Sequence, residues 1–411
     1  MSTQIFTNIK SLVNVRNSSA FLRGEELAIL PSAADAYIII EDTRIAEFGS
    51  MDNFRFTDSQ VMRQEDGIFV LPAWCDSHTH LVFAAPREAE FVDKIRGMSY
   101  AEIAARGGGI LNSAEKLNNT SEDVLFNEAW KRLEELSKLG TGAIEIKSGY
   151  GLSLDGELKM LRVIKKLKQK SLLHIKATFL GAHAYPLKYR ENHEGYIDLI
   201  INEMLPAIGN EKLADYIDVF CESGFFSPAE MEKICSAGNA FGLKPKLHVN
   251  QLNSIGGIEA GIRLDALSLD HLETLSKEEI NLLGKFKGSS TLLPTAAFFL
   301  RMPCQPARQL IDSGAAVTLA SDFNPGSSPS GNMNFVVSLS CIQMKMLPEE
   351  AINAATYNGA CAMEIQNETG SIALGKKANL IFTKPIPSLA YLPYSFGSNC
   401  IDKVMINGSF V

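Results

Sequence analysis

The sequence lacks the features of several protein classes. No uninterrupted apolar stretch in its 411 residues reaches the roughly 18 residues of a membrane-spanning helix. The first thirty residues show no basic-then-apolar pattern of a signal peptide. The seven cysteines are odd in number and form no Cys-x-x-Cys pair, which argues against a disulfide scaffold or a zinc ribbon. We therefore expect a cytoplasmic protein with reduced thiols and no membrane partner.

The sequence also lacks an excess of basic residues. It has 39 Lys and Arg residues and 47 Asp and Glu residues, which gives a net charge of −8. Nucleic-acid binding needs a clustered basic surface, so no nucleic-acid partner is expected. An anionic small molecule would need a local cation to overcome the overall field, and Arg87 lies close to the histidine motif described below.

Short strands are expected at both ends of the chain, where β-branched and aromatic residues lie between turn signals. These strands are residues 37–40, 44–48, 379–382 and 404–406, the last of which precedes the hairpin signal Asn407-Gly408. We expect residues 1–66 and 366–411 to pair into one small β-sandwich domain.

The middle of the chain, residues 67–365, alternates apolar strands with helices. Apolar residues recur at steps of three and four in residues 122–139 and 158–168, which is typical of amphipathic helices. The eight strand candidates end near Cys75, Lys147, Gly181, Cys221, His248, His271, Pro294 and Asp322. This alternation predicts a (β/α)₈ TIM-type barrel of the α/β class, with its active site at the carboxyl ends of the strands.

Histidines gather at these predicted strand ends. His78 and His80 follow the apolar run 68–74, which we expect to be the first barrel strand. On an extended backbone alternate side chains share one face, so both imidazoles can bind a single metal ion. His248, His271 and Asp322 end later strands, and His183 lies just past the third. The pattern predicts a metal-dependent hydrolase.

The order of these residues resembles the amidohydrolase superfamily, whose barrel strands carry His-x-His, His, His and Asp. Longer segments resemble the branch of that superfamily that opens an imidazolone ring in histidine degradation. They are DSHTHLVFA (76–84), KSGYGL (147–152), TFLGAH (178–183), DVFCE (218–222), DFNPGSSP (322–329) and GSIALGK (370–376).

The resemblance implies a ligand set and a reaction. One zinc or iron ion per subunit would be bound by His78, His80, His248 and Asp322. The fourth strand ends Phe220-Cys221-Glu222, without the lysine that bridges two metals in some relatives. The reaction would be hydrolysis of the cyclic amide of 4-imidazolone-5-propionate to N-formimino-L-glutamate. Asp322 ranks first as the base for the attacking water, and His271 would orient that water or stabilise the oxyanion.

The implied substrate is a small anionic ring compound. Arg87 would bind its propionate, although the sequence alone equally allows a surface salt bridge from Arg87 to Glu88 or Glu90. We expect further contacts from Tyr150, His183, Gln251, Asn324, Gly326 and Ser327, with Tyr100 as a weaker candidate. The backbone N–H groups of the loop after Asp322 are expected to help hold the anion.

Two alternative functions are left open. The first is an aromatic deaminase or another cyclic amidase of the same superfamily. It is disfavoured because Gln251 stands where related deaminases often have an acid, and glutamine cannot transfer a proton at neutral pH. The second is a metal-binding scaffold without activity, disfavoured because every expected ligand is present. A homodimer is expected only by analogy with the superfamily.

Overall fold

The structure is a computed structural model that describes residues 3–17, 20–55, 62–98, 102 and 108–411. Tyr100 lies outside these ranges. No helix in them is long and apolar enough to cross a membrane.

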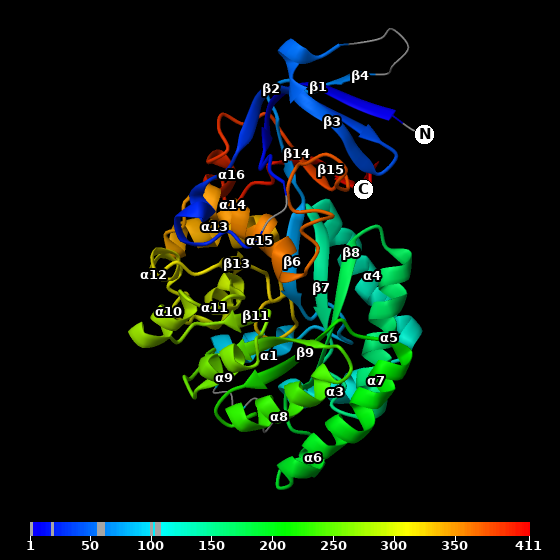
Figure 1. The fold of residues 1–411 in the computed structure, drawn as a ribbon. Coiled ribbons are helices and arrows are strands. Elements are labelled where there is room, and N and C mark those ends of the chain that lie inside the picture. Colours follow the sequence, from blue (N-terminus) through cyan, green and yellow to red (C-terminus); the bar gives the residue numbers. More distant parts are fainter. Residues whose placement is uncertain (1–2, 18–19, 56–61, 99–101, 103–107) are drawn as a thin grey trace.

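Eight parallel strands of the described chain form a barrel (Figure 1). They are β6 (Trp74–Thr79), β7 (Thr141–Lys147), β8 (His174–Ala182), β9 (Tyr216–Cys221), β10 (Lys244–Val249), β11 (Ser268–His271), β12 (Ser289–Leu292) and β13 (Val317–Leu319). The chain just after β13 closes the barrel, because the His80 N–H donates to Phe323 O at 2.8 Å and the Asp322 N–H donates to His78 O at 3.0 Å. The predicted (β/α)₈ barrel is confirmed.

Helices cover the outside of the barrel. The long ones α4 (Glu122–Lys138) and α5 (Leu154–Lys170) confirm the two predicted amphipathic helices, and Ser121 and Ser153 cap their first turns. The other α-helices of the described chain are α1 (Glu88–Ile95), α3 (Ile110–Asn118), α6 (His193–Leu199), α7 (Leu205–Glu211), α8 (Pro228–Asn239), α9 (Gly257–Arg263), α10 (Lys277–Leu283), α11 (Pro294–Leu300), α12 (Ala307–Asp312), α13 (Met333–Met344), α14 (Pro348–Ala355), α15 (Tyr357–Ala362) and α16 (Tyr391–Tyr394).

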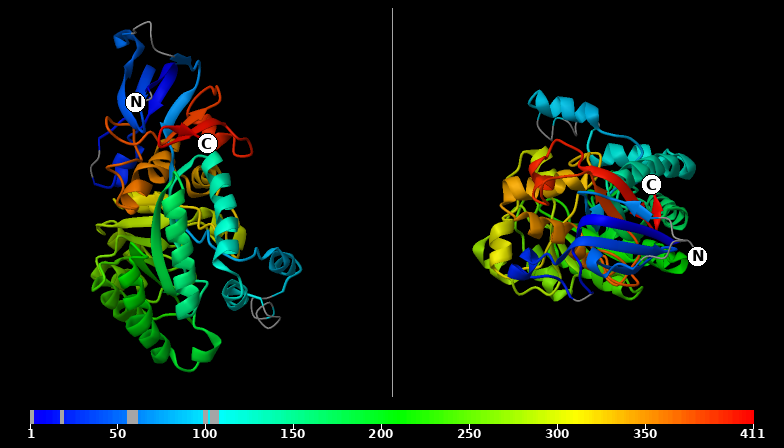
Figure 2. Two further views of the ribbon diagram at one scale, coloured as in Figure 1. Left: turned by 90° about the vertical axis from the view of Figure 1, so that its right-hand side faces the viewer. Right: turned by 90° about the horizontal axis from the view of Figure 1, so that it is seen from above.

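The two ends of the chain pair into a small β domain, as expected, and their strands form one mixed sheet where a sandwich of two sheets was expected. Its strands are β1 (Thr3–Val13), β2 (Ser32–Glu41), β3 (Arg44–Ser50), β4 (Met62–Gln64), β5 (Phe69–Pro72), β14 (Leu380–Thr383), β15 (Ile401–Ile406) and β16 (Ser409–Phe410). They run in the order β16-β15-β14-β5-β1-β2-β3, with β4 beside β1. Phe6, Ile38, Val70 and Phe382 belong to a hydrophobic core separate from that of the barrel. Figures 1 and 2 show this sheet at one end of the molecule, with both termini in it.

The apolar run 68–74 is not one strand, which corrects the sequence prediction. Phe69–Pro72 pairs with β14 and β1 in the small sheet, whereas Trp74 begins β6 and pairs with Thr141 in the barrel. The first barrel strand therefore runs on to Thr79 instead of ending near Cys75, and His78 lies within it. The small sheet also extends beyond residue 66, while the division of the chain into domains at residues 66 and 365 stays a prediction.

Candidate active site

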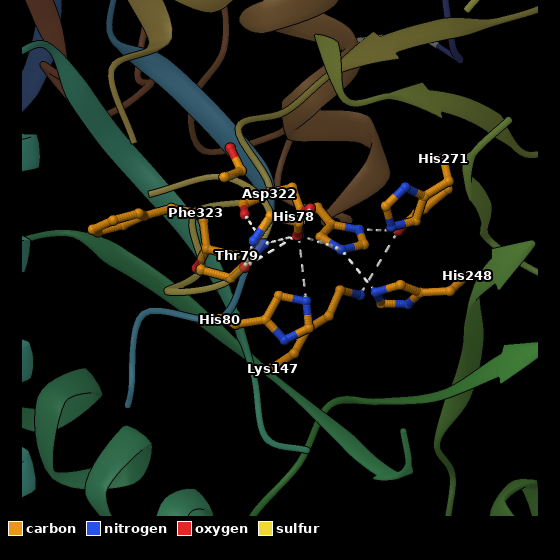
Figure 3. A network of polar contacts seen from close by, with 12 residues as sticks. His78, Thr79, His80, Lys147, His248, His271, Asp322 and Phe323 are labelled. Atoms are coloured by element: carbon orange, nitrogen blue, oxygen red, sulfur yellow. Dashed lines mark hydrogen bonds and ion pairs between the residues drawn. The ribbon is translucent and has the colours of Figure 1, made fainter. Parts of the chain in front are cut away.

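The four residues expected to bind a metal ion lie together at the carboxyl ends of the barrel strands (Figure 3). His78 Nε2 lies 3.1 Å from His248 Nε2 and 3.6 Å from Asp322 Oδ1, and His80 Nε2 lies 3.5 Å from the same carboxylate oxygen. Ligands at about 2.1 Å from a tetrahedral ion are about 3.4 Å from one another. These three separations are close to that value, and all four side chains are buried. The donor atoms fall into two groups that share His78, one with His80 and Asp322 and the other with His248 and His271.

The hydrogen bonds behind the histidines fix which nitrogens carry hydrogen. His78 Nδ1 donates to Asp270 Oδ2 at 2.7 Å, and His248 Nδ1 donates to Asp218 Oδ2 at 2.8 Å. Burial lowers the pKa of both imidazoles well below the usual value, so each ring is neutral and its Nε2 bears a lone pair. Two lone pairs that face each other at 3.1 Å repel unless a cation lies between them. The residues present therefore fit a metal ion.

Lys147 holds the two supporting carboxylates in place. Its Nζ lies 2.7 Å from Glu145, 2.9 Å from Asp218 and 3.7 Å from Asp270, and all four side chains are fully buried. Burial disfavours the ammonium, but these carboxylates outweigh burial and raise the pKa of Lys147 above the usual value. This pairing orients the carboxylate partners of His78 and His248.

His271 lies next to the metal-binding cluster. Its ring centroid is 5.0 Å from that of His248, and its Nδ1 is 3.2 Å from Glu273 Oε1, which also accepts from Gln305. Burial opposes the charge of this imidazole, but Glu273, reinforced by Asp322, raises its pKa to about 9. The ring is therefore an imidazolium at neutral pH in the metal-free protein, with Nε2–H as its second donor.

The two carboxylate oxygens of Asp322 have different surroundings. Oδ1 faces His78 and His80, whereas Oδ2 accepts a long 3.4 Å hydrogen bond from Ser327. Burial raises the pKa of Asp322 to about 7, and the nearby His271 opposes that rise. A carboxylate of this kind can accept and release a proton near neutral pH.

The metal-binding cluster opens into a cavity of about 460 Å³. All the residues nominated for substrate contact that the structure describes line it: Arg87, Tyr150, His183, Gln251, Asn324, Gly326 and Ser327. Phe220, Phe225 and Leu252 add an apolar wall. Lys94, on the same helix as Glu90, also lines the cavity and was not predicted. The spacing of Arg87, Glu90 and Lys94, three and four residues apart, is the sequence signal that places them on one helix face.

His183 stacks on the metal-binding cluster. Its ring lies 5.3 Å from that of His80 with an interplanar angle of 20°, and its Nδ1 donates to Gly149 O at 3.0 Å. Burial lowers the pKa of His183 to about 4, so the ring is neutral at pH 7. Its Nε2 is then a hydrogen-bond acceptor for a ring N–H of a ligand.

The loop after Asp322 differs from the expected anion-binding loop. The N–H groups of Gly326 and Ser327 both donate to Asn324 Oδ1 at 2.8 Å, and Asn324 Nδ2 donates to Asp322 O at 2.7 Å. The backbone donors are thus already used within the loop. Asn324 orders the loop, and an anion would depend on side chains for its binding.

Arg87 forms the expected salt bridge with Glu90, and its binding of propionate stays a prediction. Its Nε donates to Glu90 Oε2 at 2.9 Å, and its Nη2 donates to the same oxygen. The guanidinium nevertheless lines the cavity, where a Cβ on Gly326 would lie only 2.2 Å from Nη1. Glu90 therefore orients Arg87 without removing it from the site.

An eight-stranded barrel with this histidine-aspartate cluster defines the amidohydrolase class, and residues 226–411 match the amidohydrolase family. Two solved structures with 14% sequence identity to this chain share its fold. Escherichia coli guanine deaminase has a TM-score of 0.71 and covers 100% of this chain and 99% of its own, and a triazine hydrolase variant has a TM-score of 0.73 with 99% and 94% covered.

Relatives with higher sequence identity show which family within the amidohydrolase class this chain resembles. The imidazolonepropionase of Flavobacterium johnsoniae is 57% identical over 411 residues, covering 99% of each chain. That of Christiangramia forsetii is 52% identical over 410 residues, covering 100% of each, and that of Alkaliphilus metalliredigens is 36% identical over 411 residues, covering 99% of this chain and 97% of its own. The chain belongs to the imidazolonepropionase family.

Proposed function

We propose that this chain hydrolyses the cyclic amide bond of 4-imidazolone-5-propionate to N-formimino-L-glutamate. One zinc or iron ion per chain would be held by His78, His80, His248 and Asp322. The observation that carries the proposal is one cavity lined both by His80, His248 and Asp322 of this cluster and by Arg87, a cation suited to a carboxylate. A cytoplasmic location and a homodimer stay predictions.

When bound, a divalent ion at this cluster supplies a water of lowered pKa and polarises the amide carbonyl. Asp322 accepts the proton of the attacking water through Oδ2, the oxygen that faces away from the histidines. The water oxygen bonds to the carbonyl carbon, and Nε2–H of His271 stabilises the negative charge on the carbonyl oxygen. As the carbon–nitrogen bond breaks, Asp322 returns the proton to the departing ring nitrogen. The carbonyl carbon becomes a carboxylic acid, which releases the second proton of the water to solvent and leaves a carboxylate.

The remaining cavity residues orient the ring. Neutral His183 accepts a hydrogen bond from a ring N–H, and Gln251 donates to or accepts from the ring edge. Gln251 cannot protonate a ring nitrogen, which a deaminase of this superfamily would need. We therefore place Tyr150, His183 and Gln251 in substrate binding.

The test combines turnover with metal content. Purified protein, loaded with Zn²⁺ or Fe²⁺, is given enzymatically generated imidazolonepropionate, whose ultraviolet absorbance falls as the ring opens. Mass spectrometry should identify formiminoglutamate, and elemental analysis should find one metal ion per chain. No turnover by a metal-replete sample, or ammonia release from a purine or pyrimidine instead, would contradict the proposal.

A further inference from the structure

Helix α1 and the residue before it place two cationic side chains, Lys94 and Arg87, beside Gly326 in the cavity. Arg87 precedes the helix and Lys94 lies near its end, so that both side chains and Glu90 share one helix face. Lys94 Nζ donates to Gly326 O at 3.4 Å, and Arg87 Nη1 lies against the Cα of the same glycine. Both cations line the cavity.

The charge of Arg87 is already balanced, whereas that of Lys94 is not. Glu90 accepts from Nε and Nη2 of Arg87 and also from the Gly109 N–H at 2.9 Å. Among the described residues Lys94 forms no ion pair, and the Gly326 carbonyl is its one hydrogen-bond acceptor. The Arg87–Glu90 pair is neutral as a unit, so Lys94 supplies the net positive charge at this end of the cavity.

The ammonium form of Lys94 is destabilised at this position, and an anionic ligand would remove that destabilisation. Burial lowers the pKa of Lys94, and the nearby Arg87 lowers it further, while Glu90 only partly opposes the two. A carboxylate placed between the two cations would offset both effects, and it would receive charge-assisted hydrogen bonds from each. The Gly326 and Ser327 amides cannot take this role, since they donate to Asn324.

We propose that Lys94 is a second carboxylate-binding residue, which together with Arg87 selects substrates that carry an acidic side chain. This inference rests on the proposed function. Arg87 supplies the directed contact, with its orientation fixed by Glu90, and Lys94 supplies the charge that favours an anion over a neutral ring compound.

The test measures binding of two stable probes to the zinc-loaded full chain by calorimetry. Imidazole-4-propionate carries the carboxylate, and 4-propylimidazole is its neutral counterpart. Lys94→Met keeps the apolar stem and should weaken binding of the anionic probe about tenfold or more, with the neutral probe changed less than about twofold. Lys94→Arg should restore most of the affinity. Lys116→Met, a lysine of the neighbouring hollow, is the matched control and should bind both probes as the unmodified protein does.

In turnover, Lys94→Met should raise KM for imidazolonepropionate with kcat nearly unchanged. Unchanged affinity for the anionic probe, equal weakening of both probes, or the same loss in Lys116→Met would overturn the inference. The proposed function fails separately, when the unmodified protein does not turn over imidazolonepropionate.

Discussion

The Nε2 atoms of His78 and His248 lie 3.1 Å apart, and each ring donates its other hydrogen to a buried carboxylate. This relationship makes the centre a binding site for a cation and not a hydrogen-bonded histidine pair, because neither facing nitrogen has a hydrogen to donate. Asp270 and Asp218 therefore act through the histidines, by fixing the tautomer that presents Nε2.

Removal of the metal should destabilise the fold as well as abolish activity. A bound ion stabilises the native state by mass action, and its loss leaves the two lone pairs unscreened. We expect dialysis against a chelator to lower Tm by about 5 °C or more, with recovery on adding Zn²⁺. Differential scanning calorimetry measures the shift. His248→Ala is the control, since its Tm should no longer respond to the chelator, and an equal response would contradict the assigned site.

Asp270→Asn should weaken metal binding by about 10- to 100-fold, the usual effect of losing such a supporting carboxylate. The amide can still contact His78 Nδ1, but it no longer has the charge that favours the required tautomer. Competition with a chromogenic chelator gives the metal affinity. Asp155→Asn replaces an exposed aspartate at the start of α5 and should leave the affinity unchanged. Equal affinities in the two variants would show that Asp270 does not support the site.

Asp322→Asn should reduce kcat by about a thousandfold, because an amide cannot accept the proton of the attacking water. The same side chain is a proposed metal ligand, so metal content must be measured on the same sample. A variant that keeps its metal and a near-normal kcat would rule out Asp322 as the proton acceptor.

Much of this site could be predicted from the sequence because its ligands end successive strands, and a barrel brings strand ends together. The division of residues 68–74 between two sheets could not be predicted. An apolar run reports burial, but not which distant strand it pairs with, and Phe69–Pro72 and Trp74 have partners far apart in the chain. The carboxylates behind His78 and His248 were missed for the same reason, since Asp218 and Asp270 lie on strands other than those of the histidines they support.

Glu273→Gln should change how the stability of the metal-free protein depends on pH. The pKa of His271 is raised to about 9, so the folded state binds this proton more tightly than the unfolded state does. The stabilisation is complete below the ordinary pKa of about 6.5 and is lost as pH rises through about 9. It reaches about 3 kcal/mol at most, and the glutamine variant should lack most of it.

Urea unfolding at pH 6 and pH 10 tests this dependence. The difference in unfolding free energy between the unmodified protein and Glu273→Gln should be largest at pH 6 and small at pH 10. Glu259→Gln, on the exposed face of α9, should show no such trend. A difference that stays constant with pH would mean that Glu273 contributes packing and hydrogen bonds without holding the imidazolium.

Gly326→Ala should weaken substrate binding with little effect on chemistry. A Cβ at this position would lie 2.2 Å from Arg87 Nη1, so the guanidinium must move away from the cavity wall. We expect KM to rise about tenfold with kcat nearly unchanged, since the lost contact serves ground state and transition state alike. Steady-state kinetics measure both constants. Gly397→Ala adds a methyl group where no atom lies within 4 Å and should behave as the unmodified protein. An unchanged KM in Gly326→Ala would mean that Arg87 binds the carboxylate from a position that Gly326 does not limit.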